Sequence, residues 1–288
     1  MKLSGRRESS NVEDRRAGGT VKTAGGITLG GLVMGALVYF FTGDLGQAIS
    51  TGLSSGEQTV VQSGPYQETA QEKELSTFCK QILASTEDVW SAEFKRLGKT
   101  YIPPTLVFYK GTTKTACGQG QATSGPFYCS GDQKIYLDLE FLATMKQNLG
   151  ASGDFANAYV IAHEVGHHVQ EQLGYLGAAH NQMARMNEVD ANKMSVRIEL
   201  QADYIAGVWG NRENATHFSL DAGDMAEALD AAKKIGDDYL QKKAGYRQVQ
   251  ADAFTHGTSD QRVRWLNKGL QSGDITKGDT YSIPYNSL

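Results

Sequence analysis

Two histidines and a glutamate near the middle of the chain have the spacing of a zinc-binding helix. The segment HEVGH runs from His163 to His167, and Glu164 directly follows the first histidine. On a helix, side chains four residues apart lie on one face, so both imidazoles can reach a single zinc ion. Glu164 lies beside that face, where its carboxylate can take a proton from a zinc-bound water. The motif therefore predicts metal-assisted hydrolysis.

A catalytic zinc also needs a third protein ligand and one open position. The metzincin pattern would put another histidine six residues after the motif, but the chain has leucine there. Glu199 interrupts an apolar helical pattern downstream, and its carboxylate could complete a site of two histidines and one glutamate. Asp203, one turn later, could hydrogen-bond the far ring nitrogen of His163 and fix its tautomer. A solvent-exposed acidic stripe is the alternative for these two carboxylates.

Four other side chains remain candidates for the third ligand. His168 adjoins the motif but points about 100° away around the helix. The others lie in more polar stretches, and they are His180, Asp190 and His217.

His256 is a candidate for catalysis rather than for metal binding. It precedes a predicted helix that Thr258 or Ser259 could cap. A loop histidine directed at the zinc could hydrogen-bond the oxyanion of a tetrahedral intermediate. A surface loop histidine without a catalytic role is the alternative, and we expect Arg262 and Arg264 to form structural ion pairs.

The elements around these residues indicate an α+β fold. Two runs rich in β-branched and aromatic residues, 104–109 and 134–139, predict strands. From Asp154 onward the pattern is almost wholly helical. Strands followed by helices make an α+β layout, so we expect a mainly helical domain with a small β-sheet over residues 74–288.

The chain has three cysteines, too few for a small domain built on disulfides. Cys117 and Cys129 flank a short segment between the two predicted strands, and we predict a disulfide between them if the domain lies in an oxidising compartment. Two reduced, buried thiols are the alternative. Cys79 lies in a helical stretch and is expected to be a free core residue.

The N-terminal quarter of the chain predicts a membrane anchor. Residues 24–43 carry no charge, and about 20 such residues suffice for a helix to cross a bilayer. Residues 1–23 contain six lysines and arginines, which predicts that they lie in the cytoplasm. Residues 44–73, rich in Gly, Ser, Gln and Thr, predict a flexible linker. A cleaved signal peptide is the main alternative.

Charge and length exclude other classes of protein. The chain has 288 residues, a net charge of −4 and a pI near 5.9, which argues against a nucleic-acid-binding protein. With 40% hydrophobic residues it can bury a substantial core, so it is not globally disordered.

Several segments between about Thr86 and Leu266 resemble the neutral zinc metallopeptidases of bacteria, single-pass membrane proteins with a gluzincin-like site. The segments are TEDVW (86–90), ACG (116–118), GPFYC (125–129), GDFANAYVIAHEVGHHVQ (153–170), ELQADYIAGVW (199–209) and HGTSDQRVRWL (256–266). The resemblance implies a zincin-like domain with one zinc ion on His163, His167 and Glu199, and with Glu164 catalytic. It implies little about the substrate.

We therefore predict a zinc-dependent endopeptidase with Glu164 as general base, tethered to the extracytoplasmic face of the bacterial inner membrane. Its partners would be a peptide or protein substrate and, through residues 24–43, the membrane. One alternative is a non-catalytic envelope scaffold, in which protein ligands close all four zinc positions. Another is a protease whose own tether is the substrate.

Overall fold

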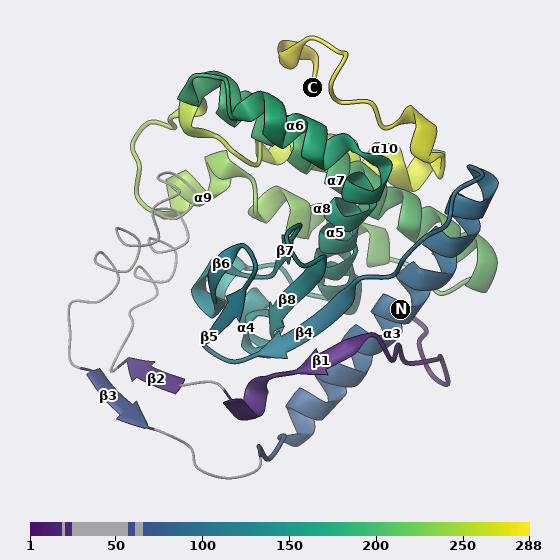
Figure 1. Ribbon diagram of the computed structural model, residues 1–288, viewed down its shortest axis with the longest axis vertical. Helices are drawn as coiled ribbons and strands as arrows, with labels where there is room; N and C mark the ends of the chain where they lie inside the picture. The colour runs from purple at the N-terminus through teal and green to yellow at the C-terminus, as the bar shows by residue number, and fades with distance from the viewer. Residues whose placement is uncertain (19–20, 25–56, 61–65) are drawn as a thin grey trace.

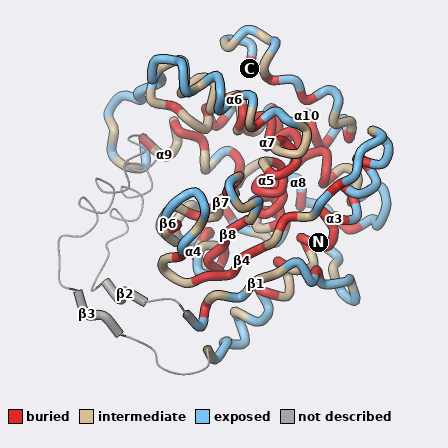
Figure 2. The backbone as a smooth tube through the Cα atoms, viewed as in Figure 1, coloured by how far each residue is buried: buried red, intermediate tan, exposed pale blue. Residues whose placement is uncertain are grey.

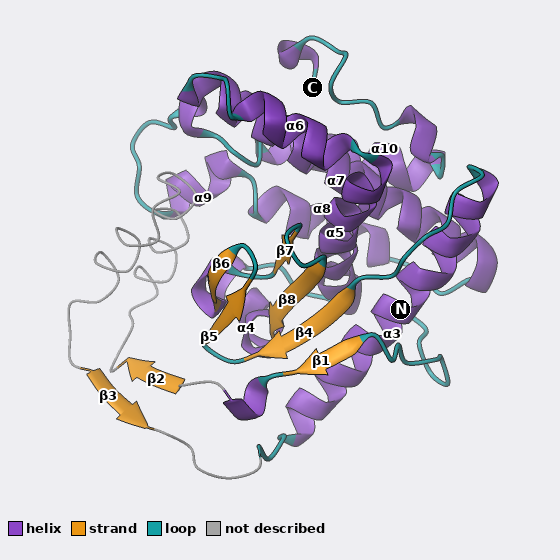
Figure 3. Cartoon of the chain, in the orientation of Figure 1, coloured by secondary structure: helices purple, strands orange, loops and turns teal. Residues whose placement is uncertain are grey.

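The computed structural model describes residues 1–18, 21–24, 57–60 and 66–288. A four-stranded sheet stands beside a group of helices (Figure 3). Three of its strands are parallel and the edge strand β7 is antiparallel to its neighbour. In spatial order the strands are β1 (Val12–Asp14), β4 (Thr105–Tyr109), β8 (Lys134–Asp138) and β7 (Phe127–Cys129).

The two central strands alternate between two apolar environments, as a period of two residues requires. Leu106 and Phe108 of β4 face the main core, which they share with the helices. Val107 and Tyr109 face the opposite side, where they form a smaller cluster with Tyr136 of β8. The strands predicted over 104–109 and 134–139 are therefore present as β4 and β8, and both are buried on the two faces of the sheet.

The remaining strands form two antiparallel pairs. One pairs β2 (Val21–Ala24) with β3 (Glu57–Val60), and the other pairs β5 (Thr112–Thr115) with β6 (Gly118–Gln121). A disulfide between Cys117 and Cys129 joins the turn between β5 and β6 to the end of β7. Cys79 is a free, fully buried thiol in the main core.

Helices make up most of the chain after the sheet, in agreement with the predicted mainly helical α+β fold. The α-helices are α3 (Ala70–Arg96), α4 (Leu139–Leu149), α5 (Asp154–Leu173), α6 (Tyr175–Met183), α7 (Glu188–His217), α8 (Asp224–Lys234), α9 (Asp237–Lys243) and α10 (Ser259–Ser272). Short 3-10 turns occur at Arg16–Gly18, Ala122–Ser124, Ala251–Ala253, Ile275–Lys277 and Tyr285–Ser287. Helices α5 and α7 run through the buried centre of the molecule (Figure 2).

Helix α3 begins within the linker that we predicted over residues 44–73. Thr69 accepts a hydrogen bond from the backbone N–H of Glu72, and the Glu72 side chain accepts one from Thr69 N–H, which forms a capping box. Thr86 lies inside α3 and donates its hydroxyl proton to the Leu83 carbonyl. The domain therefore starts before residue 74. The helix that buries Trp90 begins at Ala70, several residues before its first buried side chain.

The N-terminal residues differ from the separate basic segment that we predicted for residues 1–23. Strand β1 pairs in parallel with β4, with Val12 opposite Leu106, and it lies along α3 (Figure 1). The reason is electrostatic as well as geometric, because arginines of this segment contact buried carboxylates of α3 and α7. Residues 1–16 are thus part of the folded domain.

The transmembrane helix predicted at residues 24–43 lies outside the described residues, apart from Ala24 in β2. Within the part of the chain that the structure describes, every helix is too short or too polar to cross a bilayer.

Helices α7 and α10 pack against each other at glycines. A Cβ atom on Gly269 would lie 2.1 Å from the Tyr204 carbonyl oxygen, and one on Gly207 would lie 2.3 Å from that of Leu266. Any larger side chain would push the two helices apart. This close approach brings Arg262 of α10 against Asp203 of α7.

Candidate metal centre

The two motif histidines and Glu199 meet because α5 and α7 cross closely. A Cβ atom on Gly166, inside the HEVGH motif, would lie 3.0 Å from the carbonyl oxygen of Ala202 on α7. Glycine at this position therefore allows the backbones to approach. The motif residues and the ELQAD segment face each other across this contact, both in the buried centre of the molecule.

The ligand atoms of three side chains converge at this crossing. Nε2 of His163 lies 3.1 Å from Oε2 of Glu199, and Nε2 of His167 lies 3.4 Å from Oε1 of the same carboxylate. Tetrahedral zinc with bonds of about 2.0–2.1 Å needs ligand atoms roughly 3.3 Å apart. The three residues form a group that can hold a metal ion, with its ligand atoms all within 4.8 Å of one another. Their chemistry and their spacing both fit zinc.

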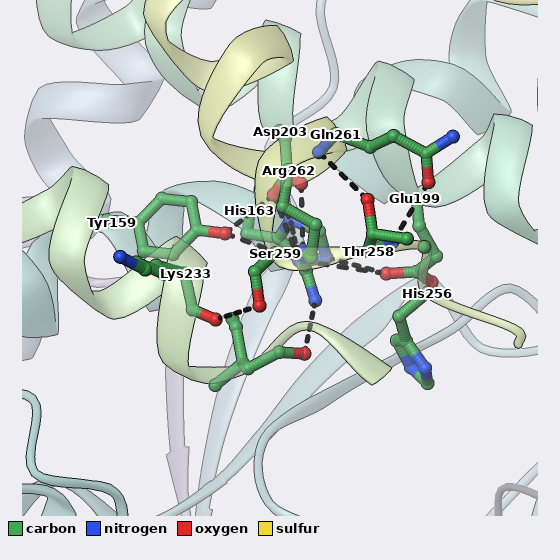
Figure 4. A network of polar contacts seen from close by, with 12 residues as sticks. Tyr159, His163, Glu199, Asp203, Lys233, His256, Thr258, Ser259, Gln261 and Arg262 are labelled. Atoms are coloured by element: carbon green, nitrogen blue, oxygen red, sulfur yellow. Dashed lines mark hydrogen bonds and ion pairs between the residues drawn. The ribbon is translucent and has the colours of Figure 1, made fainter. Parts of the chain in front are cut away.

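His163 is fixed from behind by a buried ionic network (Figure 4). Its Nδ1 lies 2.9 Å from Oδ1 of Asp203, which is fully buried. Asp203 accepts hydrogen bonds from Nε and Nη2 of Arg262, each at 2.9 Å, and from the hydroxyl of Tyr159 at 2.6 Å. Burial alone would lower the pKa of His163, but the carboxylates of Asp203 and Glu199 outweigh it and raise that pKa to about 10. A zinc ion at Nε2 would have to displace the proton that this pKa implies, because a metal-bound imidazole is neutral.

His167 has a neutral support instead. Its Nδ1 lies 2.9 Å from Oε1 of Gln170, one helical turn later. The Gln170 amide nitrogen donates to the Ile198 carbonyl and to the Gln201 side chain on α7. Burial lowers the pKa of His167 to about 4, so this imidazole is neutral, as a metal ligand must be. Gln170 was not among the predicted site residues, although its i+3 spacing from His167 placed it on the correct face.

Glu164 lies beside the three ligands and outside their group. It is buried in the wall of a cavity that His163, His167 and Glu199 also line. Burial raises the pKa of Glu164 to about 7. A carboxylate with such a pKa can accept and return a proton near neutral pH. The structure therefore separates Glu164 from the ligands, as the motif predicts.

His256 lines the same cavity from the loop before α10. Its Nδ1 lies 3.4 Å from Oδ1 of Asp237, and the other oxygen of Asp237 accepts the backbone N–H groups of Thr255, His256 and Gly257. Gly257 has a φ of +91°, a conformation that favours glycine. The nearby carboxylates of Glu199 and Asp237 outweigh burial and raise the pKa of His256. Asp237 was not predicted, because 19 residues separate it from His256.

The cavity has a volume of about 630 Å³, which is large enough to hold more than a metal ion. Beside the metal-binding side chains, aromatic and aliphatic residues form much of the cavity wall. Among these apolar residues are Phe127, Phe141, Leu149, Ile235 and Leu240. The cavity therefore suits a ligand that has both a polar backbone and apolar side chains.

The alternative third ligands lie elsewhere. His168 is buried between the Tyr128 hydroxyl and the Ile102 carbonyl, on another face of α5. His180 lines the cavity without joining the three-ligand group. Asp190 is exposed at the start of α7, and His217 at its end contacts Arg6. Arg262, expected to form a structural ion pair, does so with Asp203 at the centre of the site.

Comparison with known proteins agrees with this geometry. The chain matches the family described as "Putative neutral zinc metallopeptidase" over residues 1–281. It is 46% identical to "Uncharacterized protein YpfJ" of Escherichia coli K12 over 287 residues, 98% of this chain and 99% of that protein. It is 35% identical to "Uncharacterized protein Rv2575" of Mycobacterium tuberculosis over 219 residues, 73% of each chain. No solved structure matches it. The extent of the family match shows that the chain belongs to the neutral zinc metallopeptidase family.

Proposed function

We propose that this protein is a zinc-dependent endopeptidase that hydrolyses peptide bonds in the cavity between α5, α7 and the β5–β6 hairpin. The observation that carries the proposal is the arrangement of four side chains. His163, His167 and Glu199 bring their ligand atoms together, and Glu164 borders the same cavity without joining them. A zinc ion there would supply Lewis-acid activation of a water molecule and of the peptide carbonyl.

The residues around the ion divide the work of the reaction. Glu164 takes a proton from the attacking water and passes it to the leaving amine. His256, held by Asp237, donates a hydrogen bond to the oxygen that gains negative charge as the peptide carbonyl is attacked. The apolar wall holds side chains of the substrate, which excludes water from the reacting atoms.

An enzyme is favoured over a scaffold by the number of ligands. A structural zinc site normally has four protein ligands, most often cysteines. Among the described residues, the group at this site contains two histidines and one glutamate. One position is thus left for water or substrate, which a scaffold would not need.

We further propose that the domain works on the extracytoplasmic side of a bacterial plasma membrane, to which residues 24–43 attach it. The Cys117–Cys129 disulfide supports an oxidising compartment, and the uncharged run supports attachment to lipid.

The activity is tested by digesting an unbiased peptide library with the purified full-length protein and identifying the new termini by mass spectrometry. We expect internal cleavage by the wild type, loss of cleavage after chelation, and recovery when zinc is restored. Glu164→Gln, purified in parallel, controls for contaminating proteases. Cleavage that is equal in wild type and Glu164→Gln, or absent from zinc-loaded wild type, would contradict the proposal.

A further inference from the structure

The N-terminal residues are built into the domain by backbone hydrogen bonds. The Leu106 N–H of β4 donates to the Asn11 carbonyl, and the Arg15 N–H donates to the Phe108 carbonyl. Earlier in the segment, the Ser9 N–H donates to the Lys80 carbonyl on α3. The segment therefore contacts both the edge of the sheet and the helix beneath it. Without residues 1–16, β4 would become an exposed edge strand.

Charged contacts add to this backbone pairing. Arg6 Nη1 lies 2.7 Å from Oε1 of Glu213 on α7, a carboxylate with no exposed surface. Arg7 Nη1 lies 2.8 Å from Oε2 of Glu87 on α3, and Asn11 donates to the other oxygen of that carboxylate. A buried carboxylate that loses its cationic partner is strongly destabilising. The domain thus depends on the N-terminal segment for charge balance in its core.

The strands on either side of residues 25–56 also lie next to each other. Strand β2 follows the N-terminal segment, and β3 precedes α3. The two strands pair antiparallel, with Ala24 opposite Glu57. The 32 residues between those two positions therefore begin and end side by side.

These observations place Ala24 and Glu57 on the same side of any bilayer. Strands of one sheet must lie on the same side of a bilayer, because hydrogen-bonded pairing requires direct contact.

We propose that residues 1–16 and residues 66–288 fold together on one side of the membrane, so that no bilayer separates the basic N-terminus from the rest of the domain. The basic N-terminus is then a structural part of the peptidase rather than a cytoplasmic anchor flank. Any attachment by residues 24–43 is made from the side on which the active site lies.

Cross-linking in intact cells tests this proposal on the full-length chain. Glu8 and Lys80 form an ion pair of 3.5 Å, and both side chains are partly exposed. We would make Glu8→Cys with Lys80→Cys, insert a specific protease site after residue 46, and treat cells with a short, membrane-permeant bis-maleimide. After lysis and proteolysis, we expect the two fragments to remain covalently joined.

Two controls make the result specific. Glu8→Cys alone reports any reaction with the native Cys79, and Glu8→Cys with the exposed Lys277→Cys reports non-specific linking. A monofunctional maleimide confirms that both introduced cysteines react in cells. Fragments that separate although both cysteines are reactive would overturn the proposal.

Sidedness is measured independently with a membrane-impermeant maleimide on Glu8→Cys and Lys277→Cys, each as a single variant. We expect both positions to be labelled under the same condition, either before or only after permeabilisation. Labelling of one position in intact spheroplasts and of the other only after permeabilisation would overturn the proposal. Neither measurement requires peptidase activity, so its result is separate from the fate of the proposed function.

Discussion

The two sides of the candidate active site are built differently. On one side is the ligand cluster. We define it as His163, His167 and Glu199 together with the residues that hold the two histidines, Gln170 on α5, Asp203 on α7 and Arg262 on α10. Its side chains are packed into the core, and each histidine has a fixed partner for its far nitrogen. On the other side is the cavity wall, where Glu164 and His256 border open space.

The difference separates metal binding from turnover. In the ligand cluster, buried hydrogen bonds and ion pairs hold each group in place, so a substitution there should change metal affinity. In the cavity wall, the ionisable groups have pKa values shifted by burial or by neighbouring carboxylates and can reach a substrate. A substitution there should reduce the rate while the metal remains bound.

The largest effect is expected from Glu199→Gln. A neutral amide replaces the anionic ligand, so we expect loss of zinc and, with it, loss of all peptidase activity. Elemental analysis after dialysis measures the metal, and Glu188→Gln, an exposed position on the same helix, is the matched control. Full zinc content and full activity in Glu199→Gln would place the third ligand elsewhere.

Glu164→Gln should reduce peptidase activity without loss of zinc, unlike Glu199→Gln. The amide cannot accept a proton from water, so turnover should fall by about 10²–10⁴-fold, the usual contribution of a general base. Zinc should stay at the wild-type ratio, because Glu164 lies outside the ligand group. If zinc is lost together with activity, the distinction between ligand cluster and cavity wall fails.

His256→Gln should lower kcat by about 10²–10³-fold, the effect of removing one donor to a developing oxyanion, with zinc retained. Asp237→Asn should have a smaller effect of the same kind, because it acts by positioning the His256 loop. Steady-state kinetics on one cleaved peptide separates kcat from KM. An unchanged kcat in His256→Gln would return this residue to a structural role.

Substitution of Asp203 or Gln170, which hold the two histidines, should weaken zinc binding by about 10–100-fold, less than substitution of a ligand. Asp203→Asn should also lower the free energy of unfolding by about 3–5 kcal/mol, because Arg262 is then a buried charge without its full partner. Gln170→Leu removes a neutral amide and should cost less stability. Zinc titration and urea denaturation of both variants test this contrast, and equal loss of stability would contradict it.

The sequence predicted those parts of the site that depend on local spacing. The four-residue separations between His163 and His167, and between Glu199 and Asp203, each place two side chains on one helix face. The role of Asp237 and the partner of Arg262 could not be predicted in this way, because they depend on how α10 packs against α7 and α9. Periodicity within one helix carries no information about that packing.

The fold, too, could be predicted only where the signal lies within one element. Strands β4 and β8 were predictable because they are buried on both faces and rich in β-branched and aromatic residues. Strand β1 was not, because it has three residues, two of them acidic, in a segment where arginines dominate the pattern. Its place is set by pairing with β4 and by carboxylates on distant helices, which composition alone does not reveal.

The most direct test of the account is X-ray absorption spectroscopy of the zinc-loaded wild-type protein, recorded beside Glu164→Gln. We expect the same spectrum for both, with two imidazoles and only nitrogen and oxygen neighbours at about 2.0–2.2 Å. The wild type alone should cleave peptides. A sulfur neighbour, a third imidazole in the first shell, or a coordination shell that changes in Glu164→Gln would contradict the assignment of His163, His167 and Glu199 as ligands and Glu164 as the base.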